Sequence, residues 1–211
     1  MIKDDDDVGE LIEQVSKKQP DLVEFRFDNV QDFSIIEKVG HEKRFPAIAT
    51  DKAEREASVI KKLLLTAATS DFEFVDVNSA NEVAISLIEQ LKSNGAQTVV
   101  SFHDSNRTPS LLEMSKILDF ERQVGGDVCK IVTTAKHPED NLTILRFVSE
   151  RSRETRLVSF AMGSLGVPSR ILSPLFGAQF TYAALDDQSE TALGQITIDD
   201  LRTAWRILGI Q

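Results

Sequence analysis

The spacing of apolar residues changes from a helical to a strand-like period near the start of the chain. The first apolar positions recur at helical intervals: Val8, Leu11, Ile12 and Val15. Residues 22–27 instead alternate between apolar and polar side chains. Because helices repeat about every 3.6 residues and half-buried strands every two, the pattern predicts a helix followed by a strand.

Short strand-like segments then alternate with helix-sized segments along the whole chain. The strand candidates are residues 22–27, 47–50, 72–77, 98–102, 128–132, 157–160 and 179–182. Strands that alternate with helices are typical of a parallel α/β fold. Because no linker or low-complexity segment interrupts these units, the pattern favours a (β/α)8 TIM barrel that forms a single domain over residues 1–211.

The N-terminus must supply the remaining strand of this barrel. Only residues 1–3 precede the first predicted helix. We therefore expect a very short or incomplete first strand.

Two helix signals support the alternation of strands and helices. Val83, Leu87 and Leu91 form an apolar stripe at helical spacing, and Thr197 with Asp200 resembles a capping box. The first signal predicts a helix around residues 83–91, and the second predicts a helix that begins after Thr197.

Composition and charge exclude several classes of partner. The chain has 211 residues, 41% of them hydrophobic, and a formal net charge of −10. Affinity for nucleic acid or for an anionic membrane surface requires a basic field, so neither is expected.

The single cysteine cannot form an internal disulfide and no run of about 18 apolar residues is present, so we expect a cytoplasmic protein. The acidic run at 4–7 matches no ligand spacing, so no metal is expected.

A lysine lies inside the apolar run "DVCKIVTTAK". Lys130 is flanked by Val128, Cys129, Ile131 and Val132. A buried amine loses hydration, which favours the neutral form that can attack a carbonyl carbon. A lysine can also extend its charged head to the end of a strand. The local sequence leaves both interpretations open.

Polar residues at strand ends are candidates because barrel active sites lie at the C-terminal ends of the strands. His103 follows the strand predicted at 98–102, where an imidazole suits proton transfer near neutral pH but also suits a structural role. Glu24 and Arg26 point to one face of their strand. They contact either a ligand or a structural ion-pair partner on a neighbouring strand, and the pattern leaves both open.

Two loops have the composition of an anion site. The segment "MGSLGVPSR" ends in Arg170, and "ALGQI" contains Gly194 and Gln195. Barrel enzymes often bind anions with the loops after their last two strands. Since the planar guanidinium donates two hydrogen bonds at once to a carboxylate or phosphate, Arg170 is the predicted anion-binding residue.

The ordered motifs "EFRFD", "SFHD", "CKI", "MGSLGVPSR", "FGAQFTYA" and "GQI" resemble those of the type I 3-dehydroquinate dehydratases of the shikimate pathway. The resemblance extends from Asp21 to Gln211 and implies a lyase of aromatic amino acid biosynthesis. By this resemblance, Lys130 matches the lysine that forms an imine (Schiff base) with the substrate ketone. His103 matches the histidine that acts as general acid and base.

The resemblance also implies a set of substrate-binding residues. The positions that hold the substrate's hydroxyls and carboxylate are matched by Glu24, Arg26, Arg170 and Gln195. Lys52 stands where the family usually has an arginine, and Thr191 stands where it has a serine before the Gly-Gln motif. Lysine keeps the charge but lacks the bidentate fork.

Asn78 is the main departure from the family pattern. In "FVDVNS" the family has a glutamate at this position, which supports the catalytic histidine. The amide oxygen of Asn78 can accept a hydrogen bond from an imidazole N–H, but it supplies no negative charge. We therefore expect slower chemistry than with a glutamate.

The implied reaction is the dehydration of 3-dehydroquinate to 3-dehydroshikimate, with no metal or organic cofactor. The substrate is a small anionic cyclic hydroxy-ketone acid, and a homodimer is the assembly considered. Two alternatives remain open: another lysine-imine barrel enzyme such as a class I aldolase, and a non-catalytic barrel homologue that binds a shikimate-pathway metabolite. The loops that contain Arg170 and Gln195 favour the dehydratase.

Overall fold

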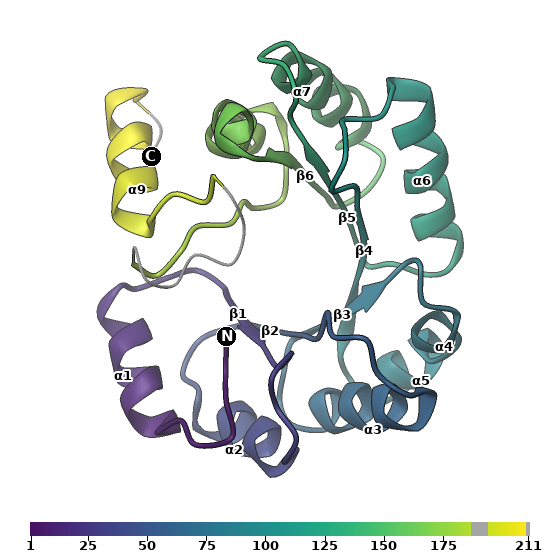
Figure 1. The fold of residues 1–211 in the computed structure, drawn as a ribbon, viewed down its shortest axis with the longest axis vertical. Coiled ribbons are helices and arrows are strands. Elements are labelled where there is room, and N and C mark those ends of the chain that lie inside the picture. The colour runs from purple at the N-terminus through teal and green to yellow at the C-terminus, as the bar shows by residue number, and fades with distance from the viewer. Residues whose placement is uncertain (187–193, 210–211) are drawn as a thin grey trace. The chain divides into compact units, whose positions relative to one another are not determined.

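The computed structural model describes residues 1–186 and 194–209 (Figure 1). The chain divides into two compact units. The first unit comprises residues 1–100 and 124–127, and the second comprises residues 101–123 and 128–211. Strand β4 (Gln97–His103) begins in the first unit and ends in the second. Each unit has its own cluster of buried apolar side chains.

The first unit is a parallel sheet with helices packed on it. Its strands β1 (Val23–Arg26), β2 (Ala47–Thr50) and β3 (Phe74–Asn78) are neighbours in that order. Phe25 lies opposite Ala49, which in turn lies opposite Val75. The helices of this unit are α1 (Val8–Lys17), α2 (Ser34–Glu42), α3 (Ala57–Ala68), α4 (Glu82–Ser86) and α5 (Ile88–Ser93).

Helix α1 forms where the apolar spacing predicts it. Asp7 precedes the helix, and its Oδ1 accepts a hydrogen bond from the Glu10 N–H at 3.1 Å, which satisfies one of the free donors of the first turn. Val8, Ile12 and Val15 are the buried residues of the helix, at the spacing of one face. The predicted first helix is therefore confirmed.

The second unit has the same pattern of strand and helix. Strands β5 (Val128–Thr134) and β6 (Leu157–Met162) are parallel, with Lys130 opposite Val158. Helices α6 and α7 cover one face of these strands (Figure 1) and bury side chains such as Leu118 and Ile144 against it. The helical segments are α6 (Leu111–Gln123), α7 (Asp140–Arg151), η1 (Ser164–Gly166), α8 (Val167–Leu172), η2 (Ser173–Phe176) and α9 (Ile198–Ile207).

The N-terminal segment lies beside β1 without forming a regular strand. The backbone N–H of Ile2 donates to the carbonyl of Arg26 at 2.8 Å, and the Ile2 side chain is buried. No strand is assigned to residues 1–3. This agrees with the expected very short first strand.

The predicted strand at 179–182 is wrong. The segment has no sheet ladder, and its backbone contact with β6 is the bond from Gln179 N to Leu157 O at 2.8 Å. The hydroxyl of Thr181 and the carbonyl of Tyr182 instead hydrogen-bond to Arg170. The segment is therefore held by contacts with Arg170 and not by pairing with a strand.

The helices of the described residues depart from the predictions at one point. The stripe that begins at Val83 is divided between α4 and α5, because the chain turns at Leu87. The predicted cap before α9 is confirmed, since Thr197 Oγ1 accepts a hydrogen bond from the Asp200 N–H at 3.1 Å. Among the helices that the structure describes, none is long and apolar enough to cross a membrane.

Candidate functional site

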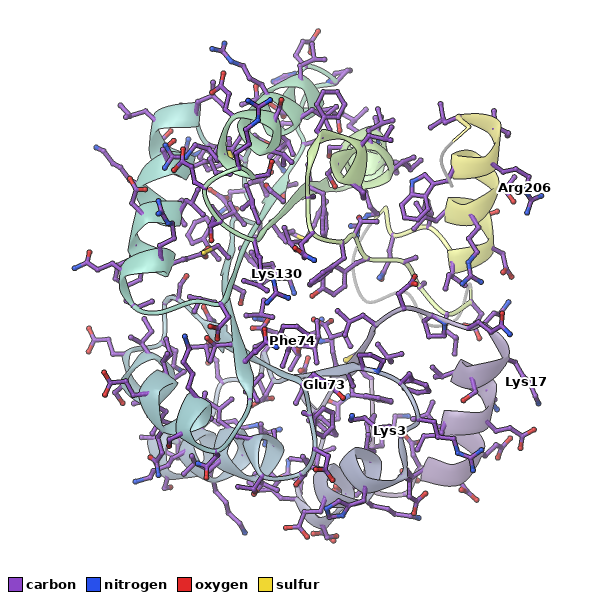
Figure 2. All side chains as sticks on the ribbon, turned by 180° about the vertical axis from the view of Figure 1, so that it is seen from behind. Lys3, Lys17, Glu73, Phe74, Lys130 and Arg206 are labelled. Carbon is purple, nitrogen blue, oxygen red and sulfur yellow. The ribbon has the colours of Figure 1, made fainter. Side chains whose placement is uncertain are left out.

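Lys130 lies on the face of β5 that is turned away from α6 and α7. Its neighbours Cys129 and Ile131 belong to the core beneath those helices. Because successive side chains of a strand point to opposite faces, Lys130 extends to the other side, as Figure 2 shows. The residue is only 4% exposed. The apolar run therefore contains two rows of side chains, and the lysine belongs to the row that faces away from the helices.

The ring of Tyr182 faces the Lys130 nitrogen. Lys130 Nζ lies 4.3 Å from the centroid of the ring, which is within the range of a cation–π contact. The Tyr182 ring also packs against Phe160, with centroids 5.8 Å apart, and against Phe180, with centroids 5.7 Å apart. These three rings form an aromatic cluster, in which the ring of Tyr182 contacts the Lys130 nitrogen.

Arg170 is a second buried cation of this unit, with 1% of the residue exposed. Its guanidinium carbon lies 4.2 Å from the centroid of the Phe160 ring, and Nη1 donates to the carbonyl of Tyr182 at 3.3 Å. Nε and Nη2 have no hydrogen-bond partner within residues 1–186 and 194–209. Burial lowers the pKa of Arg170 to about 10, so the group is still protonated at neutral pH. A buried guanidinium with two unpaired nitrogens is suited to bind a small anion.

Tyr182 brings Lys130 and Arg170 together, because its ring contacts the first and its carbonyl accepts a hydrogen bond from the second. The sequence predicted both cations but no role for this tyrosine. Tyr182 belongs to the motif "FGAQFTYA", but its contacts depend on tertiary packing that the motif alone does not show.

His103 is the last residue of β4, and its side chain is exposed. The next residue, Asp104, donates its backbone N–H to the carbonyl of Val132 at 2.9 Å. Thr134 Oγ1 donates to the carbonyl of Asp104 at 2.9 Å. These bonds hold the end of β4 beside the end of β5, so the imidazole lies at a strand end as predicted.

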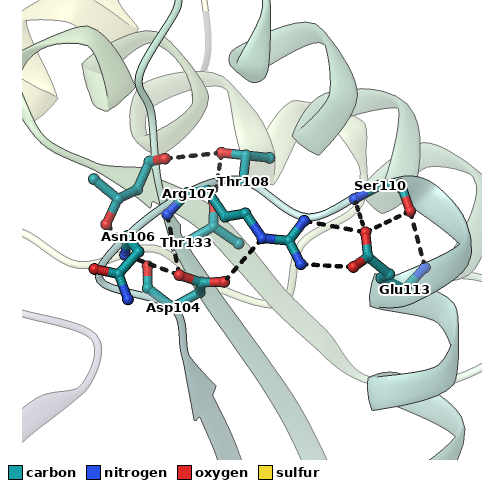
Figure 3. Close-up of polar contacts among 8 residues, drawn as sticks. Asp104, Asn106, Arg107, Thr108, Ser110, Glu113 and Thr133 are labelled. Carbon is teal, nitrogen blue, oxygen red and sulfur yellow. Dashed lines mark hydrogen bonds and ion pairs between the residues drawn. The ribbon is translucent and has the colours of Figure 1, made fainter.

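The loop that follows β4 is braced by polar contacts (Figure 3). Asp104 Oδ1 accepts the backbone N–H groups of Asn106 at 2.8 Å and Arg107 at 3.0 Å. Thr108 Oγ1 lies 3.1 Å from Thr133 Oγ1 on β5. The loop is therefore tied both to itself and to the neighbouring strand.

The same loop is joined to the start of α6 by Arg107 and Glu113. The guanidinium donates to both carboxylate oxygens, at 3.2 and 2.6 Å, and this contact lowers the pKa of Glu113 to about 2. Ser110 and Glu113 cap the helix reciprocally: Ser110 N–H donates to Glu113 Oε2 at 2.8 Å, and Glu113 N–H donates to Ser110 Oγ at 3.3 Å. The backbone after His103 is thus fixed at both ends.

In the first unit, Glu24 and Arg26 have polar neighbours. Thr50 Oγ1 donates to Glu24 Oε1 at 3.1 Å, and Arg26 Nη2 pairs with Asp28. The ion-pair interpretation therefore applies to Arg26, although its partner is on the same segment and not on a neighbouring strand. The motif "EFRFD" contains Asp28, but its pattern does not predict this pairing with Arg26.

Lys52 is held by two carboxylates. Its Nζ lies 2.5 Å from Asp76 Oδ1, and the Asp76 side chain is wholly buried. Its backbone N–H donates to Asp28 Oδ1 at 3.0 Å. The charge of Lys52 is therefore balanced before any ligand binds. Asp76 was also missed, and the signal was a carboxylate inside the apolar strand "FVDVN", as unusual as the lysine in β5.

Arg55 ties the loop after β2 to the end of β1. Its Nε pairs with Asp51 Oδ2 at 2.8 Å, and its Nη2 donates to the carbonyls of Phe27 at 2.9 Å and Asp28 at 3.1 Å. Both side chains of the pair are buried, and burial raises the pKa of Asp51. The pair fixes the backbone on which Lys52 stands.

The remaining predicted site residues are Asn78, Gln195 and Thr191. Asn78 Oδ1 accepts the N–H of Ala80 at 3.0 Å, so the amide oxygen closes the turn after β3, and its support of an imidazole stays a prediction. Gln195 is buried and follows Gly194. A Cβ on Gly194 would lie 2.3 Å from the carbonyl oxygen of Gly163, so this loop requires glycine. Thr191 lies outside the described residues.

The parallel α/β fold defines a protein of the barrel class, and two buried cations, Lys130 and Arg170, lie in its second unit. A family model described as "Type I 3-dehydroquinase" matches residues 1–211. The chain belongs to this family. A relative from Pyrococcus abyssi named 3-dehydroquinate dehydratase is 31% identical, over 97% of this chain and 95% of its own length. One from Thermococcus onnurineus with the same name is 32% identical, over 94% of this chain and 92% of its own length.

Solved structures agree with the family. The 3-dehydroquinate dehydratase of Geobacillus kaustophilus has a TM-score of 0.84 and 28% identity, over 95% of this chain and 85% of its own. The type I enzyme of Clostridium difficile has a TM-score of 0.82 at 22% identity, over 95% of this chain and 88% of its own. The predicted family, its lyase class and the barrel-type fold with a short first strand are confirmed.

Proposed function

We propose that the chain dehydrates 3-dehydroquinate to 3-dehydroshikimate through an imine on Lys130. The observation that carries the mechanism is the buried position of Lys130, turned away from the helices of its unit and against the ring of Tyr182. Such surroundings make the amine poorly hydrated, as a nucleophilic lysine requires. Membership of the type I 3-dehydroquinase family supports the substrate and the reaction.

The lysine acts through covalent catalysis. The lone pair of Lys130 Nζ attacks the ketone carbon, and the carbonyl oxygen takes up two protons and leaves as water, which gives an iminium. The positive nitrogen then accepts the electron pair of the adjacent C–H bond as that proton is removed. Expulsion of the β-hydroxyl as water restores the iminium, and a second water hydrolyses it to release the product and the amine.

His103 is the proposed general acid and base. It takes the proton next to the iminium and later protonates the departing hydroxyl, a role that contributes roughly 10²–10⁴-fold to a rate. The bonds from Asp104 and Thr134 that hold the end of β4 beside β5 support this role. The exposed imidazole can exchange protons with solvent between turnovers.

Arg170 is the proposed partner of the substrate carboxylate. Its Nε and Nη2 are buried and unpaired within the described residues, and a carboxylate would accept hydrogen bonds from both. This local charge explains how a chain with a net charge of −10 binds an anion. Gln195 and Thr191 stay proposed substrate-binding residues through the family resemblance.

Glu24, Arg26 and Lys52 are proposed to bind substrate hydroxyls or charge, again through the resemblance. Because Asp28 pairs with Arg26 and Asp76 pairs with Lys52, these two cations add little net positive charge. Their contribution is then mainly directional hydrogen bonding. The cytoplasmic location and the homodimer stay predictions, and light scattering after size-exclusion chromatography would determine the assembly.

An assay of 3-dehydroquinate turnover tests this proposal. Purified chain mixed with 3-dehydroquinate is expected to produce the conjugated enone of 3-dehydroshikimate, detected by its ultraviolet absorbance. Lys130→Ala and His103→Ala are each expected to abolish the signal, whereas Lys116→Ala on α6 should leave it unchanged. A folded wild-type chain that forms no enone would instead support a non-catalytic homologue.

A further inference from the structure

The segment that carries Arg170 has little regular structure of its own. Residues 164–166 form the short helix η1, and Arg170 belongs to α8, which has six residues. Helices of this length are not stable by themselves, because they form few internal hydrogen bonds for the residues they order. The position of Arg170 therefore depends on the contacts that fix this segment.

Within residues 1–186 and 194–209, few contacts fix the direction of the guanidinium. Its hydrogen bond to a described residue is the 3.3 Å contact from Nη1 to the carbonyl of Tyr182, and the Phe160 ring supplies an apolar surface. Nε and Nη2 have no hydrogen-bond partner in the described part of the chain. The direction of the side chain is thus set mainly by the backbone from which it extends.

Asn141, near the start of α7, binds that backbone through both ends of its amide. Its Nδ2 donates to the carbonyl of Leu165 at 2.7 Å and to the carbonyl of Pro138 at 2.9 Å. Its Oδ1 accepts the N–H of Ser169 at 2.9 Å. Because carbonyls only accept and N–H groups only donate, these partners fix the orientation of the amide. The residue is 5% exposed, so water does not readily replace these bonds.

Ser169 extends the contact from α7 to the end of β6. Its Oγ donates to the carbonyl of Gly166 at 2.8 Å and accepts the N–H of Ala161 at 3.0 Å. A Cβ on Gly166 would lie 2.4 Å from the carbonyl oxygen of Ala161, so this backbone is pressed against β6. The residue before Arg170 is therefore held on both sides, by Asn141 and by β6.

We propose that Asn141 is a positioning residue for substrate binding: through Leu165 and Ser169 it sets where the Arg170 guanidinium points. The inference rests on the proposed role of Arg170 and goes beyond it, because Asn141 is not among the proposed substrate-binding residues. Asparagine suits this task since one side chain must donate to carbonyls and accept from an N–H. Aspartate keeps the acceptor but turns a carboxylate oxygen toward the carbonyls of Pro138 and Leu165.

The test uses Asn141→Asp and, in case that chain does not fold, Asn141→Ser. Leu142→Ala, an exposed change on the same helical turn, is the matched control. Steady-state kinetics are measured with 3-dehydroquinate and with its methyl ester, which lacks the negative charge. We expect the KM for the acid to rise about 10- to 100-fold, as for a displaced hydrogen bond between charged groups. The KM for the ester and both kcat values should stay within about threefold, because the lysine chemistry is untouched.

Hydrogen exchange gives a readout that does not depend on the reaction. In either Asn141 variant, the backbone N–H groups of residues 163–167, 169 and 170 should exchange at least about tenfold faster. Those of β5, and all those of Leu142→Ala, should stay unchanged. Unchanged exchange in this segment overturns the inference, as does an equal rise in KM for acid and ester. If the wild type shows no turnover, the proposed function fails, and the exchange result alone decides whether Asn141 holds the segment.

Discussion

Lys130 and Arg170 are both buried cations, yet their neighbours suit them to different chemistry. The Lys130 nitrogen faces an aromatic ring, which stabilises a positive charge without neutralising it. Arg170 has a ring on one side and leaves two nitrogens without hydrogen bonds in the described structure. A buried charge that is not fully hydrogen-bonded costs folding free energy, so Arg170 is expected to lower stability in return for binding.

Because the Arg170 charge is expected to lower stability but to favour binding, replacing it should change these two properties in opposite directions. Arg170→Met keeps most of the side-chain volume and removes the buried charge. We expect the free energy of unfolding to rise by about 1–3 kcal/mol. The KM for 3-dehydroquinate should rise at least about a hundredfold, because two charge-assisted hydrogen bonds to the carboxylate are lost. Urea denaturation and steady-state kinetics measure the two quantities.

Arg153→Met is the control for that substitution, because Arg153 is exposed. In the control, the free energy of unfolding should change by no more than about 0.5 kcal/mol, and the KM should stay at the wild-type value. A strongly destabilised Arg170→Met chain would show that the buried guanidinium stabilises the fold, contrary to this account.

Among the secondary-structure elements, the start of α6 and the contacts of α8 with α7 and β6 fix the backbone near two proposed site residues, His103 and Arg170. The Ser110–Glu113 cap and the Arg107 contact brace the loop after His103. The hydrogen bonds of Asn141 and Ser169 brace the segment before Arg170. Loops that carry functional residues require such fixation because their own backbone supplies little.

The cap of α6 predicts a dependence of stability on acid. The pKa of Glu113 in the folded chain is lowered to about 2 by the hydrogen bonds from Arg107, and in the unfolded chain it returns to its ordinary, higher value. Its contribution to stability is therefore present above that ordinary value and is lost as the pH falls toward 2. Glu113→Gln should make the fall in stability below about pH 4.5 shallower, as measured by urea denaturation across pH. Glu150→Gln, on an exposed ion pair with Arg146, should keep the wild-type profile.

The close contact between Gly166 and β6, just before α8, predicts a steric effect of substitution at Gly166. A methyl group there would lie 2.4 Å from the carbonyl oxygen of Ala161, so the segment must move away from β6. Gly166→Ala should lower the free energy of unfolding by about 1–3 kcal/mol, as overpacking does, and raise the KM for 3-dehydroquinate. Gly9→Ala, in α1, should be neutral or stabilising because alanine favours helix. Wild-type stability and KM in Gly166→Ala would show that α8 is not held by this contact.

The spacing of apolar residues predicts the strands well where one row of apolar side chains packs against helices. The strands β1 to β6 fall within a few residues of the predicted segments, because each has an apolar row against helices. The segment 179–182 was mispredicted because Phe180 and Tyr182 alternate like strand residues but pack in the aromatic cluster. Lys130 and Arg170 could be selected as candidate site residues from the sequence, because one is an amine inside an apolar run and the other is a guanidinium in a loop of small residues. Asn141 and Asp76 could not be assigned from spacing, since their roles depend on partners far along the chain.

At the scale of the whole molecule, the two units have separate cores while the family match covers the full chain. The single domain expected from the sequence stays a prediction. A chain that folds as one domain loses all of its structure in one cooperative transition. Two independently stable units would instead unfold in two steps.

A pair of core substitutions distinguishes these outcomes. Phe27→Ala in the core of the first unit and Phe147→Ala in that of the second are each expected to cost about 3–5 kcal/mol. In a single domain, each change lowers the one midpoint of thermal unfolding seen by circular dichroism. Independent units would show a second transition that keeps the wild-type midpoint in each variant.

The central claim is the imine on Lys130, and borohydride reduction tests it most directly. The folded chain is incubated with 3-dehydroquinate and sodium borohydride, digested and analysed by mass spectrometry. We predict a stable substrate adduct on the peptide that contains Lys130, none in Lys130→Ala, and a retained adduct in His103→Ala, which lacks turnover. A wild-type chain that turns over 3-dehydroquinate but forms no adduct at Lys130 would contradict the account.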